Sequence, residues 1–115
     1  MANIIKFKDE VLCENLKVAD DFISRLIGLM FKKDMYGFDG LLIKQCNSIH
    51  TFFMRYAIDI IFLDKEYKVV KVIEDIKPWR ATLMYFKASQ VLELKSGTLK
   101  SRIKKDDQLE MICTN

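Results

Sequence analysis

The stretch Cys46-Asn-Ser-Ile-His-Thr-Phe-Phe-Met-Arg-Tyr-Ala-Ile-Asp-Ile-Ile-Phe-Leu-Asp64 combines the most apolar run of the chain with unusual polar chemistry. It contains the only histidine, His50, and the pair Met54-Arg55. Asp59 interrupts the run from Ile58 to Leu63, which has the length and composition of a buried strand. A buried carboxylate is costly unless it is paired or hydrogen-bonded. The stretch therefore predicts a central strand and a site beside it.

The sequence on either side of this stretch predicts mostly strands. Short apolar or alternating runs bounded by polar breaks are typical of strands. A polar turn at 64–67 predicts a hairpin between two of them. The runs Ile4 to Phe7 and Val11 to Ala19 together predict one or two N-terminal strands. The other expected strands are Leu41 to Ile43, Ile49 to Phe53, Ile58 to Leu63, Lys68 to Ile76, Ser89 to Leu94 and Gln108 to Cys113.

Two segments predict helices. Asp20-Asp21 offers an N-cap, and an apolar stripe follows that includes Phe22, Leu26 and Met30, so we expect a helix packed on the core through Leu26. A second, short helix is expected between Ser96 and Lys105. Strands outnumber helices and follow one another directly. The prediction is an α+β fold: one domain over residues 1–115, with a largely antiparallel curled sheet or partly open barrel, one main helix and a second short helix.

Composition and charge exclude several classes of protein. The chain has 115 residues, 50% of them hydrophobic, a net charge of +3 and three cysteines without a CxxC pair. We therefore expect free thiols, no metal and no cofactor, and a cytoplasmic location, because charge also appears too early for a signal peptide. No membrane span is expected, since no apolar run approaches about 20 residues. No nucleic-acid partner is expected, because the basic cluster from Lys100 to Lys105 has no aromatic residues interleaved with it.

An ordered set of motifs spans nearly the whole chain. The motifs are Arg25-x-x-Gly28-Leu29-Met30, Gly40-Leu41-Leu42-Ile43, His50-Thr51-x-x-Met54-Arg55, Ile58-Asp59-Ile60-Ile61-Phe62-Leu63-Asp64, Val69-Val70, Pro78, Val91-Leu92-Glu93-Leu94 and Gly97-Thr98. In this order and spacing the chain resembles the domain-of-unknown-function 192 family of bacterial and archaeal proteins over roughly residues 11 to 113. The resemblance implies a compact β-rich α+β fold and leaves the activity open.

The polar residues of these motifs suggest a small binding module. Its ligand would be a small anionic or polar molecule, or a peptide end, held by arginines in a pocket near residues 46–64. Asp59 would be held by a cation (Arg25, Arg55 or His50) or by backbone amides. The candidate site residues are Arg25, His50, Thr51, Met54, Arg55, Asp59 and Trp79.

Two other functions remain open at this point. One is a hydrolase-like enzyme in which His50 acts as general base and Asp59 orients it. The other is a protein-interaction module that uses exposed sheet edges. The sequence predicts neither an oligomeric state nor the relative positions of His50, Arg55 and Asp59.

Overall fold

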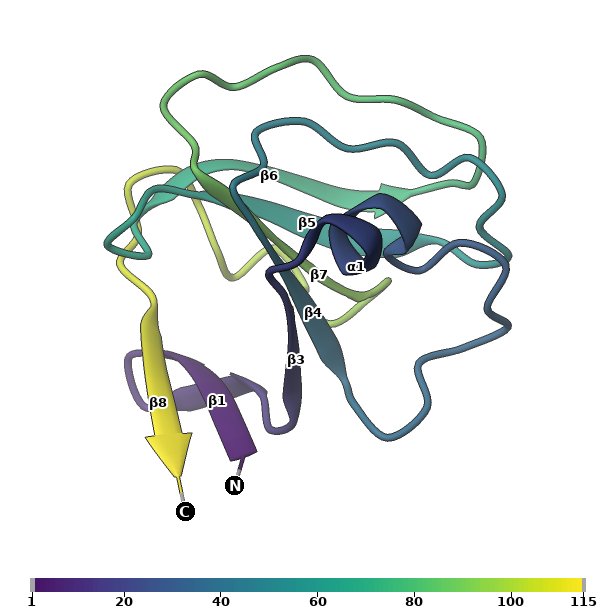
Figure 1. The fold of residues 1–115 in the computed structure, drawn as a ribbon. Coiled ribbons are helices and arrows are strands. Elements are labelled where there is room, and N and C mark those ends of the chain that lie inside the picture. The colour runs from purple at the N-terminus through teal and green to yellow at the C-terminus, as the bar shows by residue number, and fades with distance from the viewer. Residues whose placement is uncertain (1, 115) are drawn as a thin grey trace.

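A computed structural model describes residues 2–114, which fold into two sheets and one short helix (Figure 1). The radius of gyration is 12.8 Å, close to the ~13 Å of a compact domain of about 100 residues. The elements are β1 (Ala2–Phe7), β2 (Glu10–Cys13), β3 (Leu16–Ala19), α1 (Phe22–Ile27), β4 (Gly40–Lys44), β5 (Ile58–Leu63), β6 (Val69–Ile76), β7 (Gln90–Lys95) and β8 (Glu110–Thr114).

The larger sheet has five strands in the order β3-β4-β7-β5-β6. Only β3 and β4 run parallel; the other neighbours are antiparallel. Every residue of β5 is buried, so both faces of the sheet are covered at that strand. The predicted hairpin between β5 and β6 is confirmed. Asp64 directly follows β5, and its Oδ1 accepts the backbone N–H groups of Glu66 and Lys68 at 2.8 and 3.0 Å.

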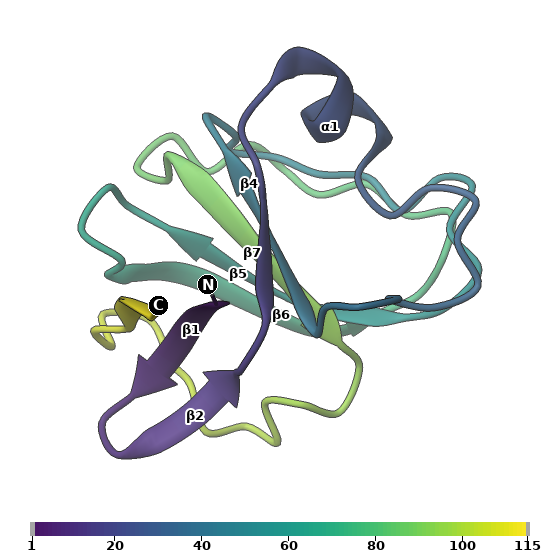
Figure 2. The same ribbon diagram turned by 60° about the horizontal axis from the view of Figure 1, so that its bottom comes forward.

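The smaller sheet brings the first and last strands together in the order β2-β1-β8 (Figure 1). It lies against one face of the larger sheet (Figure 2). Ile5 of β1 and Leu12 of β2 share a hydrophobic cluster there with Ile61 and Leu92 of the larger sheet. We call this the first core.

The opposite face of the larger sheet carries a second core. Ile58, Ile60 and Phe62 point into it, whereas Ile61 and Leu63 belong to the first core, as the alternation of a strand requires. Loop residues, not a second sheet, cover this face. Its buried residues from outside the strands are Leu29, Met35, Met54 and Ala88. A face covered by loops offers room for a pocket.

Helix α1 differs from its prediction. Asp21 is the N-cap, as expected, and its carboxylate accepts the Ser24 N–H at 2.8 Å. The helix ends after six residues at Gly28, whose φ of 51° a helix does not allow, and none of its residues is buried. Leu26 is 59% exposed, so the expectation that it packs on the core is wrong. The chain reaches the core just beyond the helix, through Leu29.

Two other predicted elements, the strand 49–53 and the second short helix, do not form within residues 2–114. The segment 49–53 is not a strand; His50 forms one isolated bridge with Ala81. The segment 96–105 contains turns in place of the second helix, because Lys100 and Ser101 both have positive φ, which a helix does not accommodate. Leu99 is nevertheless fully buried in the first core.

The fold is thus mostly β, with one short helix and two open sheets in the described residues. The strand-rich part of the predicted α+β class is confirmed, and a closed barrel is not formed. The one helix within residues 2–114, α1, is not long and apolar enough to cross a membrane.

Candidate functional site

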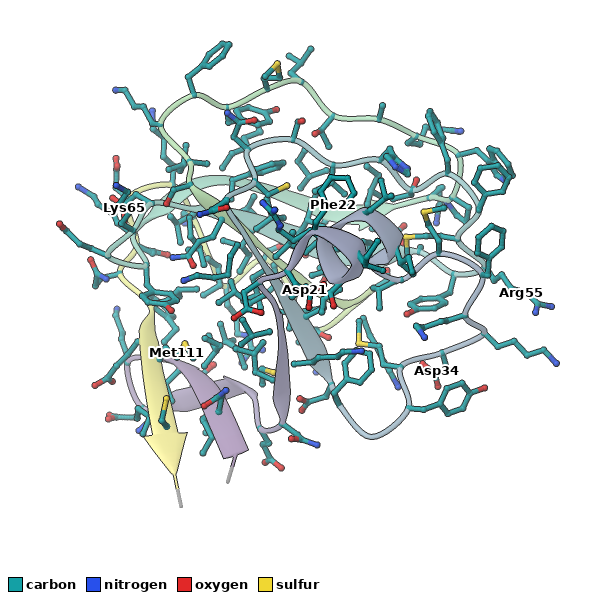
Figure 3. All side chains as sticks on the ribbon, in the orientation of Figure 1. Asp21, Phe22, Asp34, Arg55, Lys65 and Met111 are labelled. Carbon is teal, nitrogen blue, oxygen red and sulfur yellow. The ribbon has the colours of Figure 1, made fainter. Side chains whose placement is uncertain are left out.

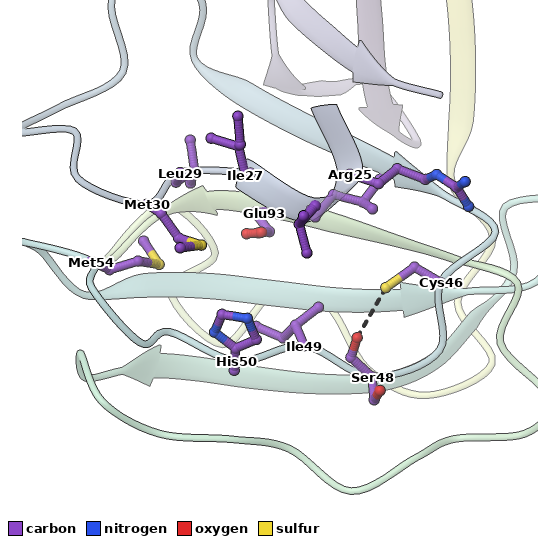
Figure 4. A pocket seen from close by; sticks show the side chains of 13 residues that line it. Arg25, Ile27, Leu29, Met30, Cys46, Ser48, Ile49, His50, Met54 and Glu93 are labelled. Carbon is purple, nitrogen blue, oxygen red and sulfur yellow. Dashed lines mark hydrogen bonds between the residues drawn. The ribbon is translucent and has the colours of Figure 1, made fainter. Parts of the chain in front are cut away.

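A pocket opens on the second-core face, between α1 and the loop that follows β4 (Figure 4). The space inside it that a bound molecule could fill is about 80 Å³, below the roughly 300 Å³ of drug-sized sites, so the pocket suits a ligand group of a few atoms. Seven of the thirteen lining residues are Leu, Ile or Met, and polar atoms contribute nearly half of the exposed wall. The lining residues are Arg25 to Met30 on the helix side, Ile43, Cys46, Ser48, Ile49, His50, Met54 and Glu93.

Glu93 is the buried polar group of this pocket. It lies on β7 between Leu41 of β4 and Ile60 of β5, and it is 4% exposed. No hydrogen bond or ion pair within residues 2–114 satisfies its carboxyl group. Burial raises the pKa of Glu93 to about 8. At pH 7 the carboxyl group is therefore protonated in most molecules and can both donate and accept a hydrogen bond.

Tyr56 and Cys46, near Glu93, both have raised pKa values. The hydroxyl of Tyr56 is buried without a hydrogen-bond partner among the described residues, and burial, assisted by Glu93, raises the pKa of Tyr56 to about 12. Burial also raises the pKa of Cys46, whose thiol donates to the Ser48 carbonyl at 2.9 Å (Figure 4). A thiol with a raised pKa is a poor nucleophile.

Three predicted site residues line the pocket. Met54 is 5% exposed and forms part of its wall. His50 is exposed at the rim, where its Nδ1 accepts the Phe52 N–H at 3.2 Å. Arg25 contributes its stem, but its guanidinium points away from Glu93 (Figure 4) and donates to Gln45 Oε1 at 3.1 Å.

The other four predicted residues lie outside the pocket lining. Arg55 extends from the edge of the molecule (Figure 3). Thr51 is fully buried, and Trp79 is 56% exposed. Thr51 Oγ1 donates to the Lys77 carbonyl at 2.7 Å and accepts the Arg80 N–H at 2.9 Å.

Asp59 is fully buried but faces the first core with Ile61 and Leu63, as its place in the strand predicts. A bulge in β6 faces Asp59, because the pairing steps from Ile58–Ile76 to Ile60–Ile73. The Asp59 carboxylate accepts the backbone N–H of Asp75 at 2.8 Å and that of Leu99 at 3.1 Å. The backbone-amide alternative is thus confirmed and the cation partner is wrong.

Glu93 was missed at the level of sequence, although a signal exists. Val91-Leu92-Glu93-Leu94 places a carboxylate inside an apolar strand just as Ile58-Asp59-Ile60 does.

No metal site is evident among the described residues. Residues 2–114 hold no group of three or more His, Cys, Asp or Glu side chains that is placed to bind a metal ion.

A family model described as uncharacterized ACR, DUF192, matches residues 4–111. The chain belongs to the DUF192 family. The predicted resemblance is therefore confirmed. A UPF0127 protein of Pyrococcus horikoshii is 42% identical over 92 residues, which cover 77% of this chain and 78% of that protein. A UPF0127 protein of Pyrococcus furiosus is 36% identical over 114 residues, 96% of each chain.

Two crystal structures share the fold at low identity. One is a protein of Sinorhizobium meliloti proposed as a transcription regulator, with a TM-score of 0.78 and 20% identity, covering 96% of this chain and 94% of that one. The other is a protein of unknown function from Novosphingobium aromaticivorans, with a TM-score of 0.77 and 17% identity, covering 94% and 82%. At these identities the likeness concerns the fold alone.

Proposed function

We propose that this DUF192 protein is a small-molecule-binding module whose ligand occupies the pocket beneath α1. The buried Glu93 carboxyl group carries the proposal. The residue is 4% exposed, no protein group among residues 2–114 bonds its carboxyl group, and it lines a pocket with mixed apolar and polar walls. Its oxygens are not closed off from solvent, so a ligand in the pocket can supply the hydrogen-bond partner that the protein does not.

The pocket favours a ligand with an apolar body and a hydrogen-bond-donating head. Met30, Met54 and Ile43 offer apolar and polarizable contacts to the body. An ammonium group suits the head best, since it would favour the carboxylate form of Glu93 and replace an unmet hydrogen bond by a charge-assisted one. The anionic ligand that the arginines suggested is less well supported, because the Arg25 head points elsewhere and Arg55 lies outside the lining.

The binding proposal is preferred to the hydrolase alternative for a geometric reason. Both oxygens of the Asp59 carboxylate already accept backbone N–H groups in the first core. The imidazole of His50 is held by Phe52 on the second-core side. No hydrogen bond within the described residues joins His50 to a carboxylate, which a histidine–aspartate pair would require.

The test uses the methionine methyl groups as reporters. In protein labelled with ¹³C at the methionine methyls, Met30 and Met54 report on the pocket, and the exposed Met84 lies outside it. The probes are n-butylammonium, n-butanol and butyrate at millimolar concentration. We expect butylammonium to shift the Met30 and Met54 signals most strongly, butanol less and butyrate least.

Two variants check that the shifts come from Glu93. Glu93→Gln keeps the shape of the side chain but removes the negative charge, so the preference for butylammonium over butanol should disappear. Arg55→Ala changes a cation outside the pocket and should bind like the wild type. If the three probes and a broader fragment collection leave Met30 and Met54 unshifted, the proposed function is wrong.

A further inference from the structure

Three segments far apart in sequence meet beside the mouth of the pocket: residues 28–33, 50–56 and 77–82. The Phe31 N–H donates to the Phe53 carbonyl at 2.8 Å, and the Trp79 N–H donates to the Thr51 carbonyl at 3.0 Å. Thr51, fully buried, adds the two side-chain hydrogen bonds to Lys77 and Arg80 described above. These bonds fix the three segments relative to one another, so the side chains that they expose form one ordered surface.

This surface carries a continuous row of aromatic rings. Ring centroids are 5.2 Å apart between Phe31 and Phe53, and 4.8 Å between Phe53 and Trp79. The row continues at 6.0 Å from Trp79 to Phe52 and at 4.9 Å from Phe52 to His50. All five residues are exposed, Phe31 at 65% and Trp79 at 56%. Rings of this size are normally buried in a core, and here they face outward together.

The backbone is strained where it presents three of these rings. Phe31, Phe53 and Trp79 have φ values of 67°, 65° and 65°. Positive φ is rare for residues with bulky side chains, and it costs conformational free energy that the surrounding structure must supply. The hydrogen bonds around Thr51 supply part of it. Strain of this kind clusters at functional positions, which sets these residues apart from apolar side chains exposed singly on a surface.

The charges on this surface have one sign. The three segments contain the cations Lys32, Lys33, Arg55, Lys77 and Arg80, and their sequence includes no Asp or Glu. Lys77 pairs with Asp75 of β6, whereas the other four form no ion pair within residues 2–114. Ala81 aside, every exposed side chain of the three segments is aromatic or basic.

We infer that this surface binds a single-stranded polynucleotide without strong sequence preference. Aromatic rings stack on bases, and cations beside them contact phosphates, which is how sequence-tolerant single-strand sites are built. The sequence argument against nucleic acid was that the Lys100–Lys105 cluster has no aromatic residues interleaved with it. The fold supplies that interleaving elsewhere, from three segments that the sequence keeps apart.

Other occupants fit the surface less well. A second copy of the chain, docked face to face, would bring like charges together, which is unfavourable. Lipid acyl chains are better matched by exposed aliphatic side chains. Within the three segments only Ala81 is one, whereas Leu26, Ile27 and Leu83 are exposed just beyond their ends, so the vesicle measurement below tests this occupant directly. A nucleic-acid duplex hides the faces of its bases, so the rings would have nothing to stack on. This inference goes beyond the pocket, and its test does not depend on the pocket ligand.

The experiment uses Trp79 as a built-in reporter, because it is the only tryptophan of the chain. A fluorescein-labelled thymidine oligonucleotide of about 12 nucleotides is titrated with the full chain, and fluorescence anisotropy and Trp79 emission are recorded. We expect binding that quenches Trp79. Affinity should fall as salt rises from about 50 to about 200 mM, with a log–log slope of about −2 to −3 for three or four phosphate contacts.

Matched variants separate stacking from simple charge. Phe52→Ala and Trp79→Ala should each weaken binding about 5- to 100-fold, the effect of losing one base–aromatic stack. Phe86→Ala, an exposed ring outside the row, and Lys105→Ala, an exposed cation elsewhere, should change affinity less than about twofold. Thermal melts confirm that each variant is folded, and Phe52→Ala decides the question should Trp79→Ala unfold.

Four outcomes would overturn the inference. The first two are a lack of oligonucleotide binding at low salt and an equal affinity for a duplex of the same length. The third is binding to vesicles of phosphatidylserine and phosphatidylcholine in place of the oligonucleotide. The fourth is a dimer that forms at high protein concentration in sedimentation experiments and that Trp79→Ala converts back to a monomer. Each assigns the surface to a different occupant or to none.

Discussion

Asp59 and Glu93 lie on the neighbouring strands β5 and β7 and point to opposite faces of the same sheet. The register pairs Asp59 with Leu94 and Glu93 with Ile60. Paired residues share a face of the sheet and successive residues alternate, so the two carboxyl groups lie on opposite faces. Asp59 accepts two backbone N–H groups in the first core, whereas Glu93 has no such partner within residues 2–114. Two buried carboxyl groups in one sheet thus have different environments: Asp59 holds the backbone of its neighbours, and Glu93 lines the pocket for which a binding function is proposed.

The structural role of Asp59 predicts a large loss of stability on its removal. Asp59→Ala removes the acceptor of the part-buried N–H of Asp75 and of the buried N–H of Leu99, and an unsatisfied buried N–H costs about 1–3 kcal/mol. We expect the free energy of unfolding to fall by about 2–5 kcal/mol in urea melts. Glu66→Ala, an exposed acidic control, should change it by less than about 0.5 kcal/mol. Equal melts for the two variants would contradict the structural role.

Leu26 and Leu29 form a matched pair that tests the placement of α1. Leu26 is 59% exposed and Leu29 is 2% exposed, although both belong to the apolar pattern of one segment. Leu29→Ala should cost about 2–5 kcal/mol, as buried leucine truncations do, and Leu26→Ala should cost less than about 1 kcal/mol. Urea denaturation of both variants measures the difference. The opposite ranking would show that the helix packs on the core as the sequence alone suggests.

Most of the strands were predictable because their signal is local, but the run 49–53, which has the same kind of signal, is not a strand. Alternation along 58–63 correctly gave the facing of Asp59, and the polar turn after Asp64 correctly gave the hairpin. The helix shows the limit of such patterns. Periodic apolar residues indicate a stripe, but burial of that stripe requires a covering surface, and a helix of six residues that ends at Gly28 lies above the core without entering it.

The candidate site was only partly predictable for a similar reason. His50, Met54 and the Arg25 stem line one pocket, and a buried group of the same pocket, Glu93, comes from a strand about forty residues further along the chain. The aromatic row depends on hydrogen bonds between distant segments. Sequence spacing does not reveal such contacts, although an apolar strand with a single carboxylate is a signal that can be searched for.

The three cysteines predict a graded pattern of alkylation. Cys13, Cys46 and Cys113 are free. Cys113 is exposed, whereas Cys13 is buried and donates to Asp39 Oδ1 at 3.0 Å. Burial, with a further contribution from Asp39, raises the pKa of Cys13 well above its ordinary value, so its thiolate is scarce.

Native protein treated with iodoacetamide should therefore be modified first at Cys113 and last at Cys13. Intact-mass spectrometry over time, followed by peptide mapping, measures the order. Cys113→Ser should lack the fast phase. Unfolding in the absence of reductant should expose all three thiols, and recovery of a single thiol would reveal a disulfide bond and contradict both the structure and the expected reducing compartment.

The raised pKa of Glu93 predicts a stability that depends on pH. Burial moves this pKa from 4.5 to about 8, so between those values the folded protein retains a proton that the unfolded chain releases. Stability then falls as pH rises, by up to about 1.4 kcal/mol per pH unit, and the dependence ends once pH exceeds the folded pKa. The expected loss over this window is on the order of a few kcal/mol.

Glu93→Gln isolates this dependence because glutamine does not titrate. We expect the stability of Glu93→Gln relative to the wild type, measured as the difference in free energy of unfolding, to increase from about pH 5 to about pH 8. Urea melts at several pH values measure it, and Glu66→Gln, an exposed control, should remain parallel to the wild type. Butylammonium should reduce the wild-type pH dependence, since a bound cation lowers the pKa of the carboxyl group. Parallel curves for Glu93→Gln and the wild type would mean that the Glu93 carboxyl group is solvated or paired, and the pocket would then lose the group on which its proposed ligand depends.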